Sequence, residues 1–303
     1  LIMLGYGFGV TAAGPISVAL IPRYGWLSVF AFGGVASLVA TVVLAAALPE
    51  SLRFLAMTGR HPERLVRAVR RLAPERALPD GARFVLSDER REDEHPRGVA
   101  ALFEGRLRYI TPLLWAGYIA SSMTTFFLTS WGPLVYEGLG FSRDAAAWVT
   151  SSNALAGSAG GLLLMRFTDR LGVTSVAVFP AVAVPLLVVV GFAHVSQPAF
   201  IALLILLSLF LSGAHFGVTS ITGLFYPTSH RALGTGWASS MAKIGSIAGP
   251  LIGGWILSSS LPLQHTFAVM AVCPAAFCLC MLGIGSIQRR ARGEPTVVAA
   301  PAP

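Results

Sequence analysis

The sequence predicts an all-α integral membrane protein, and three observations support that prediction. Of its 303 residues, 54% are hydrophobic and only 12% are charged, whereas soluble proteins carry about 25% charged residues. Eight segments are predominantly apolar over the roughly 20 residues that a helix needs to cross a bilayer. The basic residues gather on one side of these segments, as the positive-inside rule describes. We therefore expect a bundle of transmembrane helices.

The predicted spans follow the chain in order and divide it two plus six. They cover residues 1–22, 26–48, 110–135, 145–165, 173–193, 198–224, 233–258 and 265–287. Between the second and third spans, residues 49–109 hold thirteen arginines and ten acids, which indicates a cytoplasmic linker with short helices near 60–72 and 98–105. The predicted parts are two helices at 1–48, this linker, a six-helix half at 110–290 and a disordered tail at 291–303.

The charge distribution orients the chain and excludes nucleic acid as a partner. With the linker inside, nineteen basic residues lie on the cytoplasmic side and two lie outside. All six tryptophans fall near predicted span ends, where aromatic side chains favour the membrane interface. The net charge of +8 thus follows from membrane topology. The three cysteines, all in one apolar segment, indicate packing and predict no disulfide framework or zinc site.

A weak internal repeat predicts the size of the intact bundle. Gly9-x4-Gly14-Pro15 in the first span resembles Gly245-x3-Gly249-Pro250 in the seventh, at an offset of 235 residues. The repeat pairs the first two spans with the last two and leaves four helices without counterparts. Because the chain also begins within a hydrophobic run, we expect it to represent eight of twelve helices, truncated at the N-terminus. Those eight are the last two of an N-terminal half and all six of a C-terminal half.

Lys243 is the strongest candidate for a functional residue. It is the only lysine and the only charged residue near the middle of a predicted span. An intramembrane cation costs at least about 2.5–3.5 kcal/mol and normally faces a polar cavity or a partner. It is interpreted as the receptor for an anionic substrate group, or alternatively as half of a structural ion pair with a carboxylate outside this chain.

Uncharged polar residues in the spans are weaker candidates. His215, among small and hydroxyl neighbours, fits a proton relay or a substrate hydrogen bond, and equally a bond to a backbone carbonyl. In the hydroxyl run 121–125, Thr124 and Thr125 fit either a polar cavity wall or helix–helix hydrogen bonds. Asn153 allows the same two interpretations. Glycines at small-xxx-small spacing in the fourth and seventh spans indicate close helix packing.

Two segments resemble the major facilitator superfamily. Asp169-Arg170-Leu171-Gly172, in the expected inner loop between spans four and five, is similar to the second copy of its G-x-x-x-D-R-x-G signature, although a bulkier residue replaces the leading glycine. Pro49-Glu50-Ser51-Leu52-Arg53-Phe54 resembles the P-E-S-x-R-[FW] sequence that closes the N-terminal half of many members. The resemblance implies that Asp169 and Arg170 latch the inner face; an ordinary charged turn is the alternative.

A narrower resemblance is to the aromatic acid:proton symporters. It rests on Tyr226-Pro227-Thr228, Arg231-Ala232, Gly236-Trp237 and the glycines up to Gly249-Pro250, together with Phe127-Leu128, Trp131, Pro133 and Leu139-Gly140-Phe141-Ser142. Lys243 stands where that branch usually has arginine, which exchanges a bidentate fork for a point charge. Arg231 matches a basic residue at the start of the seventh span, with a gating role or a topological anchor as its two interpretations.

The resemblance implies proton-coupled uptake of a small organic anion, most simply an aromatic carboxylate, by alternating access in a bacterial inner membrane. Lys243, Thr124, Thr125, Asn153, His215 and Trp237 are assigned to substrate binding, and Asp169, Arg170 and Arg231 to gating. We expect no cofactor and no metal, and we expect the protein to be a monomer. A sugar acid or dicarboxylate transporter and a transporter-like sensor stay open as alternatives. The absence of carboxylates and nucleophile–base pairs from the spans argues against a membrane enzyme.

Overall fold

The computed structural model describes residues 2–48, 50–52, 55–56, 62–72, 98–171, 173–192, 195–227 and 230–293. All regular structure in these ranges is helical. The chain divides into two units, residues 24–96 and the remainder. Residues 291–293 of the expected disordered tail are helical, and the rest of that tail and most of the linker lie outside the described residues.

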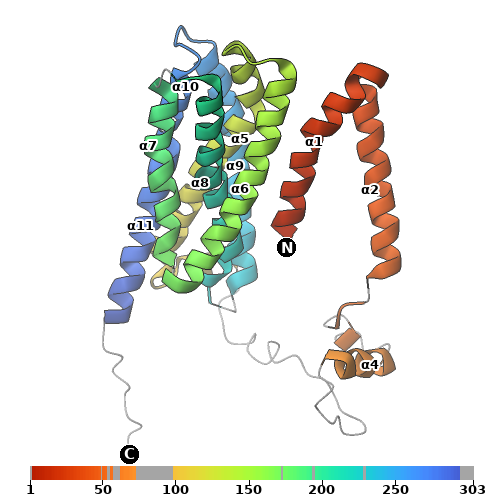
Figure 1. The fold of residues 1–303 in the computed structure, drawn as a ribbon. Helices are drawn as coiled ribbons and strands as arrows, with labels where there is room; N and C mark the ends of the chain where they lie inside the picture. The colour runs from red at the N-terminus through yellow and green to blue at the C-terminus, as the bar shows by residue number, and fades with distance from the viewer. Residues whose placement is uncertain are drawn as a thin grey trace, which may run out of the picture. The chain divides into compact units, whose positions relative to one another are not determined.

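The larger unit holds the long helical bundle in Figure 1, which contains the residues of the expected six-helix half. Its elements are η2 (Val99–Phe103), α5 (Leu107–Gly138), α6 (Arg143–Leu171), η3 (Val173–Ala177), α7 (Val178–Phe192), α8 (Gln197–Ile221), η4 (Thr222–Leu224), α9 (Arg231–Leu257), α10 (His265–Met270) and α11 (Val272–Gly293). The helix α1 (Ile2–Tyr24) also belongs to this unit, except for its last residue.

The smaller unit contains α2 (Leu27–Ala47) and α4 (Pro62–Leu72). No side chain of α2 is buried, and all except Ser28 and Val29 are exposed, as expected for an apolar span that faces lipid. In α4, Leu65 is buried while Arg64, Arg67, Arg70 and Arg71 are exposed. The helix is therefore strongly amphipathic, and it confirms the short helix predicted near 60–72.

Four helices of the described chain are both long enough and apolar enough to cross a membrane by composition alone. They are Leu27–Ala47, Ser175–Phe192, Gln197–Leu224 and His265–Arg290. The helices α5, α6 and α9 are longer than 25 residues but carry many hydroxyl and small side chains. Helices match all eight predicted spans in position, whereas the number that cross the membrane stays a prediction.

Local sequence explains where helices bend and end. Pro274 has no N–H group that could donate a hydrogen bond to the carbonyl of Met270. The helix is interrupted there, between α10 and α11. At the end of α5, Gly140 has φ 91°, and the N–H groups of Gly140 and Phe141 bond to the carbonyls of Glu137 and Tyr136 at 3.0 and 3.1 Å. This is a Schellman motif, which needs a residue with positive φ. Ser142 then caps α6 through the N–H of Ala145.

Helix pairs pack through glycines, as the small-xxx-small spacing predicts. On α9, a Cβ added to Gly249 would lie 3.1 Å from Cα of Met123 on α5. On α6, a Cβ added to Gly160 would lie 3.1 Å from Cα of Gly213 on α8. These contacts bring backbones together across two pairs of helices. The polar residues of α5, α6, α8 and α9 are thereby held at fixed distances around a common space.

Of three apolar cores among the described residues, the two larger ones lie at opposite ends of the bundle. The end that holds η2 and Tyr226 is called the inner end, after the predicted topology, and contains Tyr118, Phe277 and Met281, all at most 1% exposed. The end near the Gly140 turn is called the outer end; its core includes Phe200 and Phe267. At the inner core the Tyr118 hydroxyl bonds to that of Thr222, which donates in turn to the carbonyl of Val218 at 2.6 Å.

Candidate functional site

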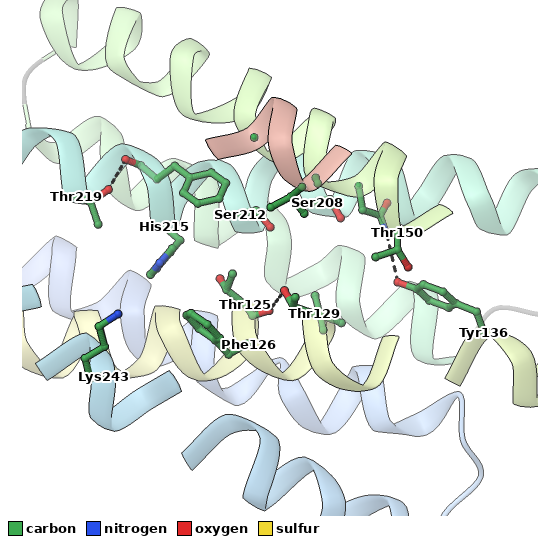
Figure 2. A pocket seen from close by; sticks show the side chains of 16 residues that line it. Thr125, Phe126, Thr129, Tyr136, Thr150, Ser208, Ser212, His215, Thr219 and Lys243 are labelled. Atoms are coloured by element: carbon green, nitrogen blue, oxygen red, sulfur yellow. Dashed lines mark hydrogen bonds between the residues drawn. The ribbon is translucent and has the colours of Figure 1, made fainter. Parts of the chain in front are cut away.

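A pocket of about 380 Å³ opens among α1, α5, α6, α8 and α9. Its volume is within the range of small-molecule sites, which is about 300–1,000 Å³. Figure 2 shows its polar side chains arranged in a row from Lys243 at one end to Tyr136 at the other. The lining residues are Gly7, Val10, Thr125, Phe126, Leu128, Thr129, Tyr136, Thr150, Asn153, Ala154, Ser208, Ser212, His215, Phe216, Thr219 and Lys243.

Lys243 is the only charged residue among those that line the pocket in the described chain. It lies in the middle of α9, two residues before Gly245, where α9 approaches Ile119 and Ser122 of α5. Figure 2 shows its ammonium group directed toward His215. Its side chain is exposed in this chain. The pocket therefore has one positive end.

His215 is buried and lies beside that positive end. Its Nδ1 is 3.1 Å from the hydroxyl oxygen of Ser121, which donates to the carbonyl of Tyr118 at 3.3 Å. Because a hydroxyl has one proton, a Ser121 hydroxyl that donates to Tyr118 can only accept from Nδ1–H. In that arrangement the proton of neutral His215 is on Nδ1, and Nε2 has a lone pair.

The middle of the pocket is lined by hydroxyl groups and aromatic rings. Thr125 and Thr129 lie one turn apart on the same face of α5, with Phe126 beside them (Figure 2). Ser208 and Ser212 line the pocket from α8. An aromatic ring in this space would meet apolar surface from Phe126 and Phe216, with polar groups at its edges.

Asn153 and Tyr136 form the far end. The Asn153 amide donates to the Tyr136 hydroxyl at 3.2 Å and links α6 to α5. The amide oxygen of Asn153 is buried and has no hydrogen-bond partner among the described residues. Tyr136 is 2% exposed and is held by the Schellman motif that follows it, where its ring lies 6.4 Å from that of Phe141.

The structure brings together Lys243, His215, Thr125 and Asn153 and places the other predicted binding residues elsewhere. Thr124 is fully buried and donates to the carbonyl of Ala120 at 3.3 Å. Trp237 lies toward the inner end, stacked on Trp115 with ring centroids 5.6 Å apart. Neither Thr124 nor Trp237 lines the pocket.

The predicted gating residues all belong to helix ends. Arg231 is the exposed first residue of α9, and its aliphatic stem would lie 3.1 Å from a Cβ on Gly223. Asp169 and Arg170 are in the last turn of α6, because the helix continues to Leu171. The expected position of Asp169 in a loop before a helix N-terminus is therefore wrong. The side chains of Asp169 and Arg170 lie outside the described part of the chain.

Several pocket residues were not singled out from the sequence, among them Thr129, Tyr136 and Thr150. A signal for Thr129 does exist, because it continues the face of Thr125 at i, i+4 spacing. Within the described residues, no group of three or more histidine, cysteine or acidic side chains could hold a metal ion. The three cysteines are free and partly buried.

The sequence is similar to a family model and to several known proteins. Residues 114–301 match the family model of the Major Facilitator Superfamily. Over 90% of its own length, the chain is 29% identical to a 4-hydroxybenzoate transporter of Acinetobacter baylyi. Over the same share of its length, it is 30% identical to a 4-hydroxybenzoate transporter of Pseudomonas aeruginosa. It is 29% identical to a gallate transporter of Pseudomonas putida over 97%. It spans 60–65% of the length of these relatives.

The family match begins within α5 and covers the rest of the bundle to α11, including α6, α8 and α9 of the pocket. The transporter names of the relatives agree with the resemblance inferred from the sequence motifs. The chain is a multi-pass integral membrane protein of the bacterial inner membrane. It belongs to the major facilitator superfamily.

Proposed function

We propose that the protein is a secondary transporter that carries a small organic anion, an aromatic carboxylate, by alternating access. The observation that carries this proposal is the composition of the pocket, in which Lys243 is the only charged residue among the described residues of the lining. A single cation in a low-dielectric site is stabilised by one anionic group. The carboxylate of the substrate fills that role and leaves its ring in the aromatic and hydroxyl-lined middle of the pocket.

The relatives support the aromatic part of the proposal. Two of them are named for 4-hydroxybenzoate and one for gallate, and both compounds are aromatic carboxylates. The superfamily also favours transport over membrane enzyme chemistry, and the Ser121 hydroxyl that bonds to His215 is not among the described residues that line the pocket. A monomer in the bilayer is sufficient for this function, since the pocket is formed within one chain.

Proton coupling is assigned to His215. Its Nε2 lone pair lies beside the cationic end and is free to accept a proton as the substrate carboxylate arrives. With the substrate present, one negative charge faces two cationic groups. Without it, protonated His215 and Lys243 repel each other, so the proton and the anion bind together. This linkage is the requirement for symport.

The gating role of Asp169, Arg170 and Arg231 is part of the same proposal. All three are on helices that line the pocket, at the ends predicted to face the cytoplasm. Charges at those positions open and close an inner gate by forming and breaking ion pairs while the membrane core moves. In this proposal Lys243 and His215 bind the substrate and are not part of the gate.

Uptake of radiolabelled 4-hydroxybenzoate by cells that express the protein tests the proposal. Benzoate analogues are expected to compete with the label, whereas sugar acids and aliphatic dicarboxylates are not. A protonophore should abolish accumulation, because the proton gradient drives it. Competition by dicarboxylates alone would show that the protein transports another organic solute. Specific binding with no flux in proteoliposomes would show a sensor.

A further inference from the structure

The threonines of the pocket have their hydroxyl protons directed into the protein. Thr125 donates to the carbonyl of Ser121 at 2.9 Å, and Thr129 donates to that of Thr125 at 2.8 Å. Thr150 and Thr219 do the same within α6 and α8, at 2.8 and 2.7 Å. A hydroxyl has one proton and two lone pairs. What these side chains offer to a ligand is therefore an acceptor.

The positions of the two α5 threonines set a distance scale from the positive end. His215 bonds to Ser121. Thr125 is one turn further along α5, about 6 Å, and Thr129 is two turns further, about 12 Å. In Figure 2 these two threonines follow one another between the Lys243–His215 end and Tyr136.

That scale matches one substitution pattern of an aromatic acid. The carboxylate and hydroxyl oxygens of a para-hydroxybenzoate are about 6.4 Å apart by ordinary bond lengths. A hydrogen bond of about 2.8 Å at each end brings the total to about 12 Å, close to the axial distance from Ser121, the hydrogen-bond partner of His215, to Thr129. A hydroxyl at the meta position lies off the line through the carboxylate and the para position, so it does not extend along that line toward Thr129.

We propose that Thr129 is a specificity-determining residue that accepts a hydrogen bond from a para-hydroxyl group. The protein then selects hydroxylated aromatic carboxylates over those that carry an alkoxy group or nothing at that position. The inference rests on the proposed function, because it takes the carboxylate to be at Lys243. An alkoxy oxygen has no proton and faces the Thr129 lone pairs, so it is rejected by electrostatic repulsion as well as by a lost hydrogen bond.

Equilibrium binding to the purified full chain in lipid nanodiscs tests the assignment. The ligands are 4-hydroxybenzoate, 4-methoxybenzoate and 3-hydroxybenzoate. The wild-type protein is expected to bind 4-hydroxybenzoate about tenfold more tightly than 4-methoxybenzoate. Thr129→Val keeps the shape of the side chain and removes the acceptor, so this ratio should fall to within about twofold. Thr129→Ser keeps the acceptor and should retain the ratio.

Thr41→Val is the matched control, because Thr41 is exposed, bonds to its own helix at 2.8 Å and is not a pocket residue. It should leave every ratio unchanged. Thr129→Val should leave the affinity for 3-hydroxybenzoate unchanged. It should change the affinity for 4-methoxybenzoate only by relieving the repulsion between the methoxy oxygen and the Thr129 hydroxyl. An unchanged ratio of 4-hydroxy to 4-methoxy ligand in Thr129→Val, or no preference in the wild type, would overturn the assignment. Failure of all three acids to bind would overturn the proposed function itself.

Discussion

The crossing of α6 and α8 at Gly160 should be sensitive to a single added methyl group. A Cβ on Gly160 would lie 2.8 Å from the carbonyl carbon of Leu209 and 3.1 Å from Cα of Gly213. Both neighbours are backbone atoms, so neither relieves the overlap by changing a rotamer. Gly160→Ala therefore forces the two helices apart.

Two opposing contributions set the expected loss of stability. Alanine is better than glycine in a helix by up to about 1 kcal/mol. Overpacking costs about 1–3 kcal/mol, and a clash with backbone belongs at or above the upper end of that range. The net change is a destabilisation of about 2 kcal/mol, which lowers the unfolding midpoint by about 4–8 °C for a protein of this size class.

Thermal unfolding in detergent, followed with a thiol-reactive dye, measures this change without engineered probes. The reporters are the three free, partly buried cysteines of α11. Gly236→Ala in α9 is the matched control, since nothing lies within 4 Å of its Cβ. That control should melt at or above the wild-type midpoint. A midpoint for Gly160→Ala that equals or exceeds the wild-type value would refute the close crossing of α6 and α8.

Three further predictions concern hydrogen bonds and protons. Trp131→Phe removes the 2.9 Å hydrogen bond from the indole N–H to the carbonyl of Pro250 and should lower the free energy of unfolding by about 1 kcal/mol in the same assay. Trp255 is exposed, so Trp255→Phe should leave that free energy unchanged. Equal effects of the two substitutions would contradict this prediction. Burial raises the pKa of Tyr226 above its usual value of about 10, so its contribution to stability is complete below that pH and is lost as the pH rises further. Tyr226→Phe should weaken the alkaline loss of stability; an unchanged pH profile would count against it. His215→Asn should make uptake independent of an imposed proton gradient, and retained acceleration by that gradient would place coupling elsewhere.

Most of the fold could be predicted because a bilayer restricts what a sequence can do. Each span needs about 20 apolar residues, and turn residues such as Gly140 and Ser142 mark the boundary between α5 and α6. Helix ends were less predictable. The helix α6 extends to Leu171, six residues past its predicted end, because hydropathy locates the hydrocarbon region and charged residues continue a helix beyond it.

The site could be predicted only in part. Lys243 and His215 are unusual enough inside spans to be identified individually. Thr124 and Thr125 are adjacent and alike, yet they point about 100° apart around α5, and only Thr125 lines the pocket. Which of the two faces the pocket depends on where α9 and α8 pack against α5. For the same reason Tyr136, far along the chain from His215, could not be joined to the site from sequence alone.

The role of Lys243 is tested most directly by the affinity of the purified protein for 4-hydroxybenzoate. Lys243→Met should weaken binding by about 10–100-fold, as expected for the loss of a charged hydrogen-bond partner, and Lys243→Arg should retain most of it. Arg143→Met removes the same charge from an exposed position at the start of α6 and should have no effect. Wild-type affinity in Lys243→Met would contradict the assignment of the substrate carboxylate to this lysine.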